Sequence, residues 1–553
     1  MRLRHLLLIP CIFIAANVSA QNKKKATATP VTETVPRPKL VVGIVIDQMR
    51  WDYLYRYYER YGQGGFKRLL SEGFRCENTT INYLPSATAV GHSSIFTGSV
   101  PAIHGIAGND WVDQLTGKAA YCVSDSTVNS VGTTSEEGKM SPRSLLASTI
   151  TDELMLATNF RSKVVGVSLK DRASILPAGH SPTGAFWFDD ATGRFITSTY
   201  YMQQLPAWVN NFNNTNEPEK LTANDWTPLY PVPTYIQSSA DNSIWEGKFA
   251  GETNTAFPHK IAELYKNRHV TIRSTPFGNT LTLDFAKAAI DAYKLGNNGT
   301  TDFLTINCAS TDYVGHMFGL NAIETEDTYL RLDKDLAAFF SNLDAKVGKG
   351  NYLVFLTADH GATHSVEFAK AHNQPGGYWK QADYKNKLNQ MLEKKFKADN
   401  LVLSVIEYAV NFNVPKIEGQ KLDYSAIKAA TVDFMKRDPN NLFAADMDKI
   451  NDAAIPEVVR AKMINGYHYK RSGAVIVIPN AGYLQAGPTG TGHGEWNPDD
   501  THIPLIFMGW NIKPGASYSD LHTTDIAPTV AALLHIQTPN GAIGQPITDL
   551  LKN

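Results

Sequence analysis

Aspartate and histidine side chains recur at short spacing in three segments of the sequence. Asp312 and His316 are four residues apart, which places both on one face of a helical turn. Asp359 and His360 are adjacent, and His493 lies in a glycine-rich loop that lets a ligand approach closely. Zinc accepts carboxylate oxygens and imidazole nitrogens. Each pair alone is more typical of a surface turn or a satisfied hydrogen bond, but together they predict a metal site.

A threonine surrounded by small residues is the candidate nucleophile. Thr88 lies in segment 85–94, which is rich in Ala, Ser and Gly, at a turn that is expected to open a helix running to Thr97. A hydroxyl at a helix start lies near free backbone N–H groups and the positive end of the helix dipole, where a phosphoryl group binds favourably. Considered alone, Thr88 is more typical of an ordinary helix N-cap.

Runs of apolar residues predict strands that are buried on both faces, as in a parallel sheet. The first run covers 40–46. Further runs cover 164–169, 303–306, 352–356, 474–478 and 504–508. Helical patterns, with apolar residues three or four apart, lie between them at 281–293 and 329–347. This alternation predicts an α/β fold with a mainly parallel central sheet flanked by helices.

Most of the candidate residues come just after these predicted strands. They are Asp47, Lys170, Asp312, Asp359 and His360. In open α/β sheets, ligands bind at the carboxyl ends of the strands. With Asp47, the candidate metal ligands are three carboxylates and three imidazoles, and we expect them to converge on one edge of the sheet.

Two segments interrupt the alternation and are expected to be insertions in a single catalytic domain over 38–553. Residues 183–275 are rich in Trp, Tyr, Asn and Pro and have weak periodicity, which indicates an irregular cap. Residues 368–470 are charged and show mainly helical patterns. The sheet is expected to resume after this second insertion.

The N-terminus indicates export. Basic residues precede a short apolar run, and Val18-Ser19-Ala20 has the small-x-small pattern of a cleavage site, so residues 1–20 are expected to be a signal peptide. Residues 21–37 read as a linker. The apolar run is too short to span a bilayer, so no stable membrane anchor is expected and the mature protein should be periplasmic or secreted. A net charge of −1 without a basic stripe excludes typical nucleic-acid binding.

Three cysteines remain after the expected cleavage. An exported protein can form disulfides, but an odd number leaves at least one thiol unpaired. The sequence allows a Cys76–Cys122 disulfide but does not establish it. Cys308 ends an apolar run and is expected to be buried.

Taken together, these motifs resemble the alkaline phosphatase superfamily, and their order is similar to that of PafA-type periplasmic alkaline phosphatases. The resemblance extends from about residue 39 to the C-terminus. It implies two zinc ions per chain and a covalent phosphothreonine at Thr88. The residues that match the two zinc sites are, for the first, Asp47, Asp359 and His360, with Thr88 as a further ligand, and, for the second, Asp312, His316 and His493.

The same resemblance implies three residues that bind the phosphoryl oxygens. Asn109 follows the His-Gly-Ile turn at 104–106, and Lys170 and Arg172 match the Lys-x-Arg pair of the PafA-type monoesterases. Two cations facing the non-bridging oxygens favour a doubly charged monoester over a singly charged diester. The expected function is therefore hydrolysis of phosphate monoesters, with small phosphorylated metabolites as substrates.

Two other functions remain open from the sequence. A phosphodiesterase or nucleotide pyrophosphatase of the same superfamily would use the same metals and Thr88, and the Lys170/Arg172 pair tells against it. A non-catalytic, zinc-stabilised binding protein is the other alternative, but the ligands, nucleophile and phosphoryl binders are all present. Without the other motifs, Lys170 and Arg172 would read as a solvated strand end.

Overall fold

The computed structural model describes residues 35–552. The signal peptide expected over 1–20, and all but the last three residues of the linker expected over 21–37, lie outside the described residues. Within the described part, no helix has the length and apolar character needed to cross a membrane.

A ten-stranded sheet forms the centre of the fold, in the order β20-β2-β19-β11-β1-β10-β7-β8-β9-β6. Its middle consists of five adjacent parallel strands: β11 (Tyr352–Thr357), β1 (Leu40–Ile46), β10 (Asp302–Cys308), β7 (Val164–Ser168) and β8 (Gly184–Asp189). The flanking strands are β19 (Leu505–Gly509), β2 (Phe74–Cys76), β20 (Gly515–Ser517), β9 (Arg194–Ser198) and β6 (Ser130–Val131). The expected α/β fold with a mainly parallel centre is confirmed.

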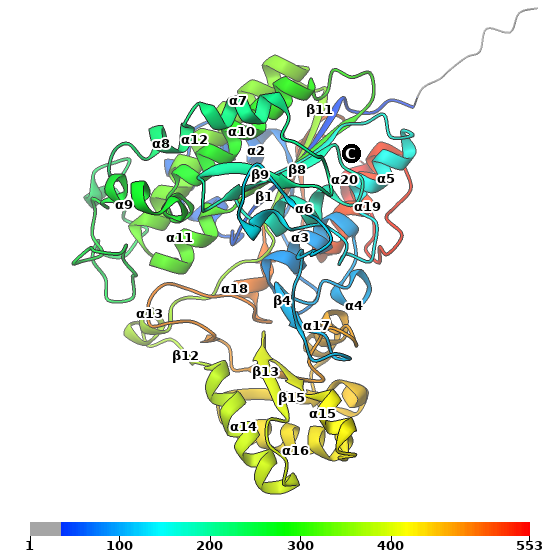
Figure 1. Ribbon diagram of the computed structural model, residues 1–553. Coiled ribbons are helices and arrows are strands. Elements are labelled where there is room, and N and C mark those ends of the chain that lie inside the picture. The colour runs from blue at the N-terminus through cyan, green and yellow to red at the C-terminus, as the bar shows by residue number, and fades with distance from the viewer. Residues whose placement is uncertain (1–34, 553) are drawn as a thin grey trace, which may run out of the picture. The chain divides into compact units, whose positions relative to one another are not determined.

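Strand β1 shows why apolar and polar residues do not alternate along the predicted strands. Val42 and Ile44 pack into one hydrophobic cluster, with α2 (Phe66–Glu72), α10 (Phe277–Tyr293) and α12 (Ile323–Leu343). Val41 and Val45 point to the other face and join a cluster with residues of α3 (Thr88–Thr97), α5 (Ile150–Ala157) and α19 (Ile526–Leu534). Both faces of the strand are therefore covered, as a buried parallel strand requires. Figure 1 shows these two helical layers around β1.

The helices on the second face bring the candidate nucleophile to the sheet. They are α3 (Thr88–Thr97), α5 (Ile150–Ala157), α6 (Asp171–Ala178) and α19 (Ile526–Leu534). The helix expected to run to Thr97 ends there, and it begins at Thr88, with Ala87 and not Thr88 as its N-cap residue. The helical patterns at 281–293 and 329–347 correspond to α10 and α12. Both helices begin earlier than expected, and a π-helical turn over Asp344–Gly348 continues α12.

The segment 183–275, which was expected to be an irregular cap, begins with two regular strands. Strands β8 and β9, within 184–198, belong to the central sheet because β8 pairs with β7 and β9 pairs with β8, and their aromatic side chains pack in its core. The remainder carries short helices, among them α7 (Ala207–Asn214), α8 (Glu217–Leu221) and α9 (Ile261–Asn267). Trp226 lies in a small separate hydrophobic cluster with Phe249 and Phe318.

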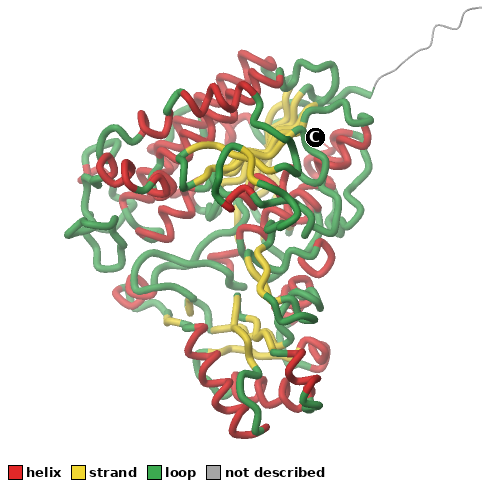
Figure 2. Tube along the Cα trace, in the orientation of Figure 1, coloured by secondary structure: helices red, strands yellow, loops and turns green. Residues whose placement is uncertain are grey.

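The second insertion has a sheet of its own. Its four strands pair antiparallel, three from the insertion and one, β16, from the residues just after it: β13 (Val402–Ile406), β14 (Ala409–Phe412), β16 (Val475–Pro479) and β15 (Asn441–Asp446). Helices α14 (Gln381–Phe396) and α16 (Tyr424–Lys436) pack against it around a separate core (Figure 2). The apolar run at 474–478 was expected to continue the central sheet. That expectation is wrong, because its pairing partners are β14 and β15.

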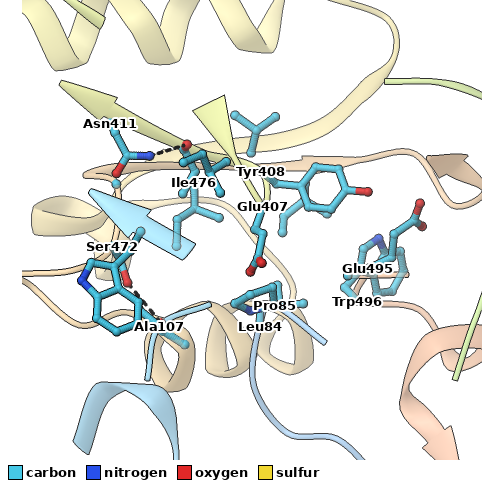
Figure 3. Close-up of a pocket in the computed structure, with 18 of the residues that line it drawn as sticks. Leu84, Pro85, Ala107, Glu407, Tyr408, Asn411, Ser472, Ile476, Glu495 and Trp496 are labelled. Atoms are coloured by element: carbon cyan, nitrogen blue, oxygen red, sulfur yellow. Dashed lines mark hydrogen bonds between the residues drawn. The ribbon is translucent and has the colours of Figure 1, made fainter. Parts of the chain in front are cut away.

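The turn between β13 and β14 reaches the catalytic part of the chain. It lines a pocket together with Leu84 and Pro85, which precede Thr88 (Figure 3). The three cysteines of the described residues are buried and unbonded. Cys76 and Cys122 lie in different hydrophobic clusters, so the structure has no bridge between them.

Candidate functional site

The carboxyl ends of four neighbouring parallel strands assemble one polar site. Asp47 follows β1, Lys170 follows β7, and Asp359 with His360 follows β11. Asp312 enters from α11 (Ser310–Phe318), the helix after β10. All five side chains are buried, with residue exposures of at most 3%. The expected convergence at this edge of the sheet is therefore present.

Asp47, Asp359 and His360 form the first group. One ligand atom from each lies within 4.8 Å of the others. His360 Nε2 is 3.4 Å from Asp359 Oδ2 and 3.7 Å from Asp47 Oδ1. These three buried atoms have no hydrogen-bond partner among the described residues. Buried polar atoms without partners are costly, and three of them facing one point fit a bound cation.

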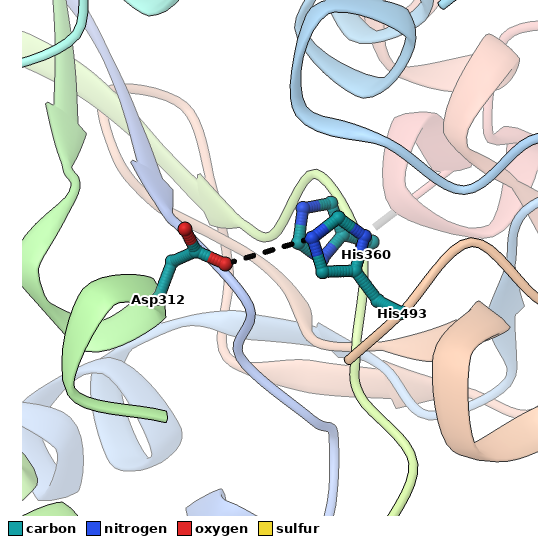
Figure 4. Close-up of side chains that lie close together, drawn as sticks. All are labelled: Asp312, His360 and His493. Atoms are coloured by element: carbon teal, nitrogen blue, oxygen red, sulfur yellow. Dashed lines mark ion pairs between the residues drawn. The ribbon is translucent and has the colours of Figure 1, made fainter. Parts of the chain in front are cut away.

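Asp312 and His493 form a second compact group, which also includes His360 (Figure 4). The rings of His360 and His493 stack at 3.6 Å between centroids. The expected third member, His316, lies beside this group: its Nε2 is 3.1 Å from Asp312 Oδ1, and its ring centroid is 5.1 Å from that of His493. The two groups therefore adjoin each other through His360.

The three imidazoles are oriented alike. Nδ1 of His316, His360 and His493 lies 2.8–2.9 Å from the backbone carbonyl of Thr491, Gly361 and Ser86, respectively. A carbonyl can only accept, so each Nδ1 carries a proton, and in the neutral imidazole Nε2 then has a lone pair that faces the site. This arrangement is typical of metal-binding histidines, whose second ring nitrogen is fixed by an outer partner.

The charges in the site also fit bound cations. Three buried carboxylates face one lysine, whose Nζ lies 2.9 Å from Asp47 Oδ2 and 2.7 Å from Asp312 Oδ2. Burial and the like charge of Asp359 raise the pKa of Asp47 to about 7. Burial, with the neighbouring His360 and His316, lowers the pKa of His493, which favours the neutral form that binds a metal.

Thr88 is the first residue of α3 and is 1% exposed. Its Oγ1 lies 3.4 Å from Lys170 Nζ. The preceding residue, Ala87, has no side-chain oxygen to cap the helix. Instead Asn109 Oδ1 accepts the backbone N–H of Ala89 at 3.0 Å, so Asn109 fixes the start of the helix that carries Thr88.

Lys170 and Arg172 lie at the start of α6 and are not a solvated strand end, because Lys170 is 1% exposed and the Arg172 side chain 18%. Arg172 Nη1 donates to Tyr121 Oη at 3.2 Å, and this hydroxyl donates to Asp171 at 2.6 Å. Arg172 Nε is buried without a partner among the described residues. The structure therefore brings Lys170 to Thr88 and holds Arg172 in place through Tyr121.

Two residues that the sequence did not single out complete the site. Gln48 donates its side-chain amide to Asp312 Oδ1 at 2.7 Å and its backbone N–H to Asp359 Oδ1 at 3.2 Å. Asn307, at the end of β10, donates to Asp47 Oδ2 at 3.2 Å. The available signal was their position at strand ends, since a polar residue in or just after a buried apolar run needs a partner there.

Four further histidines, His92, His104, His180 and His364, are outside both groups. His92 Nδ1 contacts Thr88 O at 2.8 Å and His104 Nε2 contacts Ser94 Oγ at 3.0 Å. His180 pairs with Asp152, and His364 contacts Asn321.

The chain matches known proteins along most of its length. The family described as Type I phosphodiesterase / nucleotide pyrophosphatase matches residues 41–501. Alkaline phosphatase PafA of Elizabethkingia meningoseptica is 57% identical over 94% of this chain and 96% of its own length. Alkaline phosphatase PhoV of Synechococcus elongatus is 51% identical over the full length of both chains.

A solved structure agrees with these matches. The crystal structure of wild-type alkaline phosphatase PafA superposes with a TM-score of 0.92 at 57% identity, covering 93% of this chain and 99% of that one. The identity and coverage extend across the catalytic part and both insertions. The chain therefore belongs to the type I phosphodiesterase / nucleotide pyrophosphatase family of the alkaline phosphatase superfamily, and it is a phosphate monoester hydrolase similar to PafA.

Proposed function

We propose that this alkaline phosphatase binds two zinc ions and hydrolyses phosphate monoesters through a covalent phosphothreonine at Thr88. The observation that carries the proposal is that two adjoining Asp/His groups meet at the N-terminus of α3, where Thr88 lies beside Lys170. Asp47, Asp359 and His360 would hold one ion, with Thr88 as a further ligand. Asp312, His316 and His493 would hold the other.

The donor set supports zinc. Mixed carboxylate and imidazole ligands are typical of catalytic zinc sites. Such an ion would bind the buried atoms of the first group that have no hydrogen-bond partner. It would also accept the inward lone pairs of the three imidazoles. When bound, the two ions supply Lewis-acid activation of a hydroxyl and stabilise charge on the oxygens of the displacement.

The chain's own residues account for the remaining steps. Thr88 Oγ gives its proton to solvent and forms a bond to phosphorus, while the ester oxygen leaves with the electrons of its P–O bond and takes a proton from solvent. Water then attacks the phosphothreonine, which releases phosphate and restores the threonine hydroxyl. Asn109 Nδ2, Lys170 and Arg172 would hold the oxygens that do not react, and the first N–H groups of α3 add a positive dipole.

The charge of the phosphoryl site favours monoesters. Lys170 and Arg172 provide two cations, and a monoester dianion gains more from them than a diester monoanion does. The match to the phosphodiesterase family makes diester hydrolysis the second candidate. Small phosphorylated metabolites are the proposed substrates, and a cleaved signal peptide at residues 1–20 would deliver the enzyme to the periplasm or the exterior.

Thr88→Ala tests the nucleophile. We expect kcat/KM for p-nitrophenyl phosphate to fall roughly a thousandfold or more, as when a nucleophile is removed, with zinc content nearly unchanged. Acid-quenched wild-type enzyme should carry one phosphoryl group on the peptide that contains Thr88. Normal turnover by Thr88→Ala, or label on another residue, would refute the assignment.

A further inference from the structure

One side chain of the second insertion forms a hydrogen bond with Asn109 itself. Glu407 lies at the tip of the β13–β14 hairpin, and its Oε1 accepts the backbone N–H of Asn109 at 3.4 Å. The two residues are 298 apart in the sequence. Asn109 directly precedes β4 (Asp110–Val112), which lies beside β13. The tip of the insertion is therefore built into the catalytic site.

The hairpin is held in an unusual backbone conformation at this point. Ile406 pairs with Ala409, so Glu407 and Tyr408 alone form the turn, with φ of 47° and 64°. Two-residue turns with positive φ at both positions strongly prefer Asn and Gly. Neither residue here is Asn or Gly, and each such residue carries a conformational cost. Strain of this kind persists where surrounding structure fixes it, and it often marks a functional site.

The fit around the carboxyl group is close. A Cβ on Gly108 would lie 2.9 Å from Glu407 Oε2, so only a glycine allows the carboxyl group to reach the loop at its present position. Figure 3 shows Glu407 pointing from its turn toward Leu84 and Pro85, the segment that leads to Thr88. The side chain thus lies between the two segments that carry Asn109 and the nucleophile.

Asn109 has three fixed groups. Its N–H is held by Glu407, its carbonyl accepts the N–H of Cys122 at 3.0 Å, and its Oδ1 accepts the N–H of Ala89 at 3.0 Å. The last contact orients the amide so that Nδ2 remains available to a phosphoryl oxygen. Losing the Glu407 contact would leave a backbone N–H without a partner and loosen the loop.

We propose that Glu407 is a positioning residue, through which the hairpin of the second insertion fixes Asn109 for phosphoryl binding. This inference rests on the proposed role of Asn109. Burial and the like charge of Asp110 raise the pKa of Glu407 to about 8. The neutral acid therefore predominates near neutral pH, and glutamine is its matched replacement because it keeps an acceptor oxygen in the same place.

Glu407→Leu and Glu407→Gln test the proposal as a pair of similar volume. We expect Glu407→Leu to lower kcat/KM for p-nitrophenyl phosphate, and to raise the inhibition constant of inorganic phosphate, about threefold to tenfold, the usual worth of one hydrogen bond. Glu407→Gln should stay within about twofold of wild type on the same reasoning. Thermal stability of Glu407→Leu should change little, since removal of a buried carboxyl group stabilises the fold while the Asn109 N–H left without a partner destabilises it.

Asn109→Ala separates this inference from the function on which it rests. In that background, Glu407→Leu should cause no further loss, because the side chain it positions is gone. Glu418→Ala, at an exposed site in the same insertion, is the control and should match wild type. Wild-type phosphate binding by Asn109→Ala would refute the role of Asn109. If Glu407→Leu lowers kcat/KM by the same factor in wild type and in Asn109→Ala, or in neither, the role of Glu407 alone is refuted.

Discussion

Replacing Gly91 with alanine tests the fit between α3 and the loop that carries two proposed zinc ligands. A Cβ on Gly91 would lie 2.3 Å from the backbone oxygen of Asp359 and 2.7 Å from its Cβ. Ordinary contact begins at 3.4 Å, so the helix and the loop would have to separate by roughly 1 Å. These are backbone and Cβ atoms, which cannot move aside as the end of a long side chain could.

Two opposing effects set the expected magnitude. Alanine within a helix is more favourable than glycine by about 1 kcal/mol, whereas overpacking costs about 1–3 kcal/mol. The free energy of unfolding should therefore fall by roughly 0–2 kcal/mol. Activity should suffer far more, because a displacement of about 1 Å between reacting groups can cost about a hundredfold.

The assay combines thermal unfolding, zinc content and kcat/KM for p-nitrophenyl phosphate. Gly419→Ala is the control: it also adds a methyl group to a helical glycine, but nothing lies within 4 Å of it. We expect the control to keep full activity. A Gly91→Ala enzyme that is more stable than wild type and equally active would show that α3 and the Asp359 loop do not need this contact.

Two further predictions concern stability. Asn109→Ala should lower the free energy of unfolding by about 1 kcal/mol through loss of the helix cap. Asn109→Asp keeps the acceptor for the Ala89 N–H and should unfold like wild type, but its kcat/KM should fall further than that of Asn109→Ala, since it turns a negative charge toward the phosphoryl group. An Asn109→Asp enzyme with wild-type activity would contradict this. Buried His259 lies 3.2 Å from Glu252 and 3.0 Å from Glu324, and although burial opposes its charge, these carboxylates raise its pKa to about 9. Protonated His259 therefore stabilises the fold fully below the unfolded pKa of 6.5, and this stabilisation is lost as pH rises through about 9. The difference in melting temperature between wild type and His259→Gln should be largest below pH 6.5. A difference that widens above pH 9 would refute the reasoning.

The sequence predicted the catalytic edge of the sheet well because its signals are local. Strand β1 reads as an unbroken apolar run, and both of its faces are covered, so the pattern and its cause agree. Thr88 and Thr97 bound α3 as expected, since small residues mark its start and Gly98, at φ 64°, marks its end. Asp47, Asp359 and His360 converge because their strands are neighbours.

Features that depend on pairing across the chain were not visible. The run at 474–478 is a strand, but its apolar pattern does not say whether its partners lie in the central sheet or in the insertion. The aromatic residues at 184–198 resembled an irregular cap, although they are strands whose bulky side chains fill the core. The contact between Glu407 and Asn109 joins segments 298 residues apart, and neither segment carries a motif for it.

We propose that paired zinc ions and the Lys170/Arg172 cations make this enzyme selective for monoesters. The most direct measurement is hydrolysis of p-nitrophenyl phosphate beside bis-p-nitrophenyl phosphate by the purified mature protein, with metal content determined on the same sample. Two zinc ions per chain with a strong monoester preference, which narrows when Lys170 and Arg172 are both replaced with alanine, is the predicted result. A preference for the diester, or an unchanged ratio in the double variant, would contradict the claim.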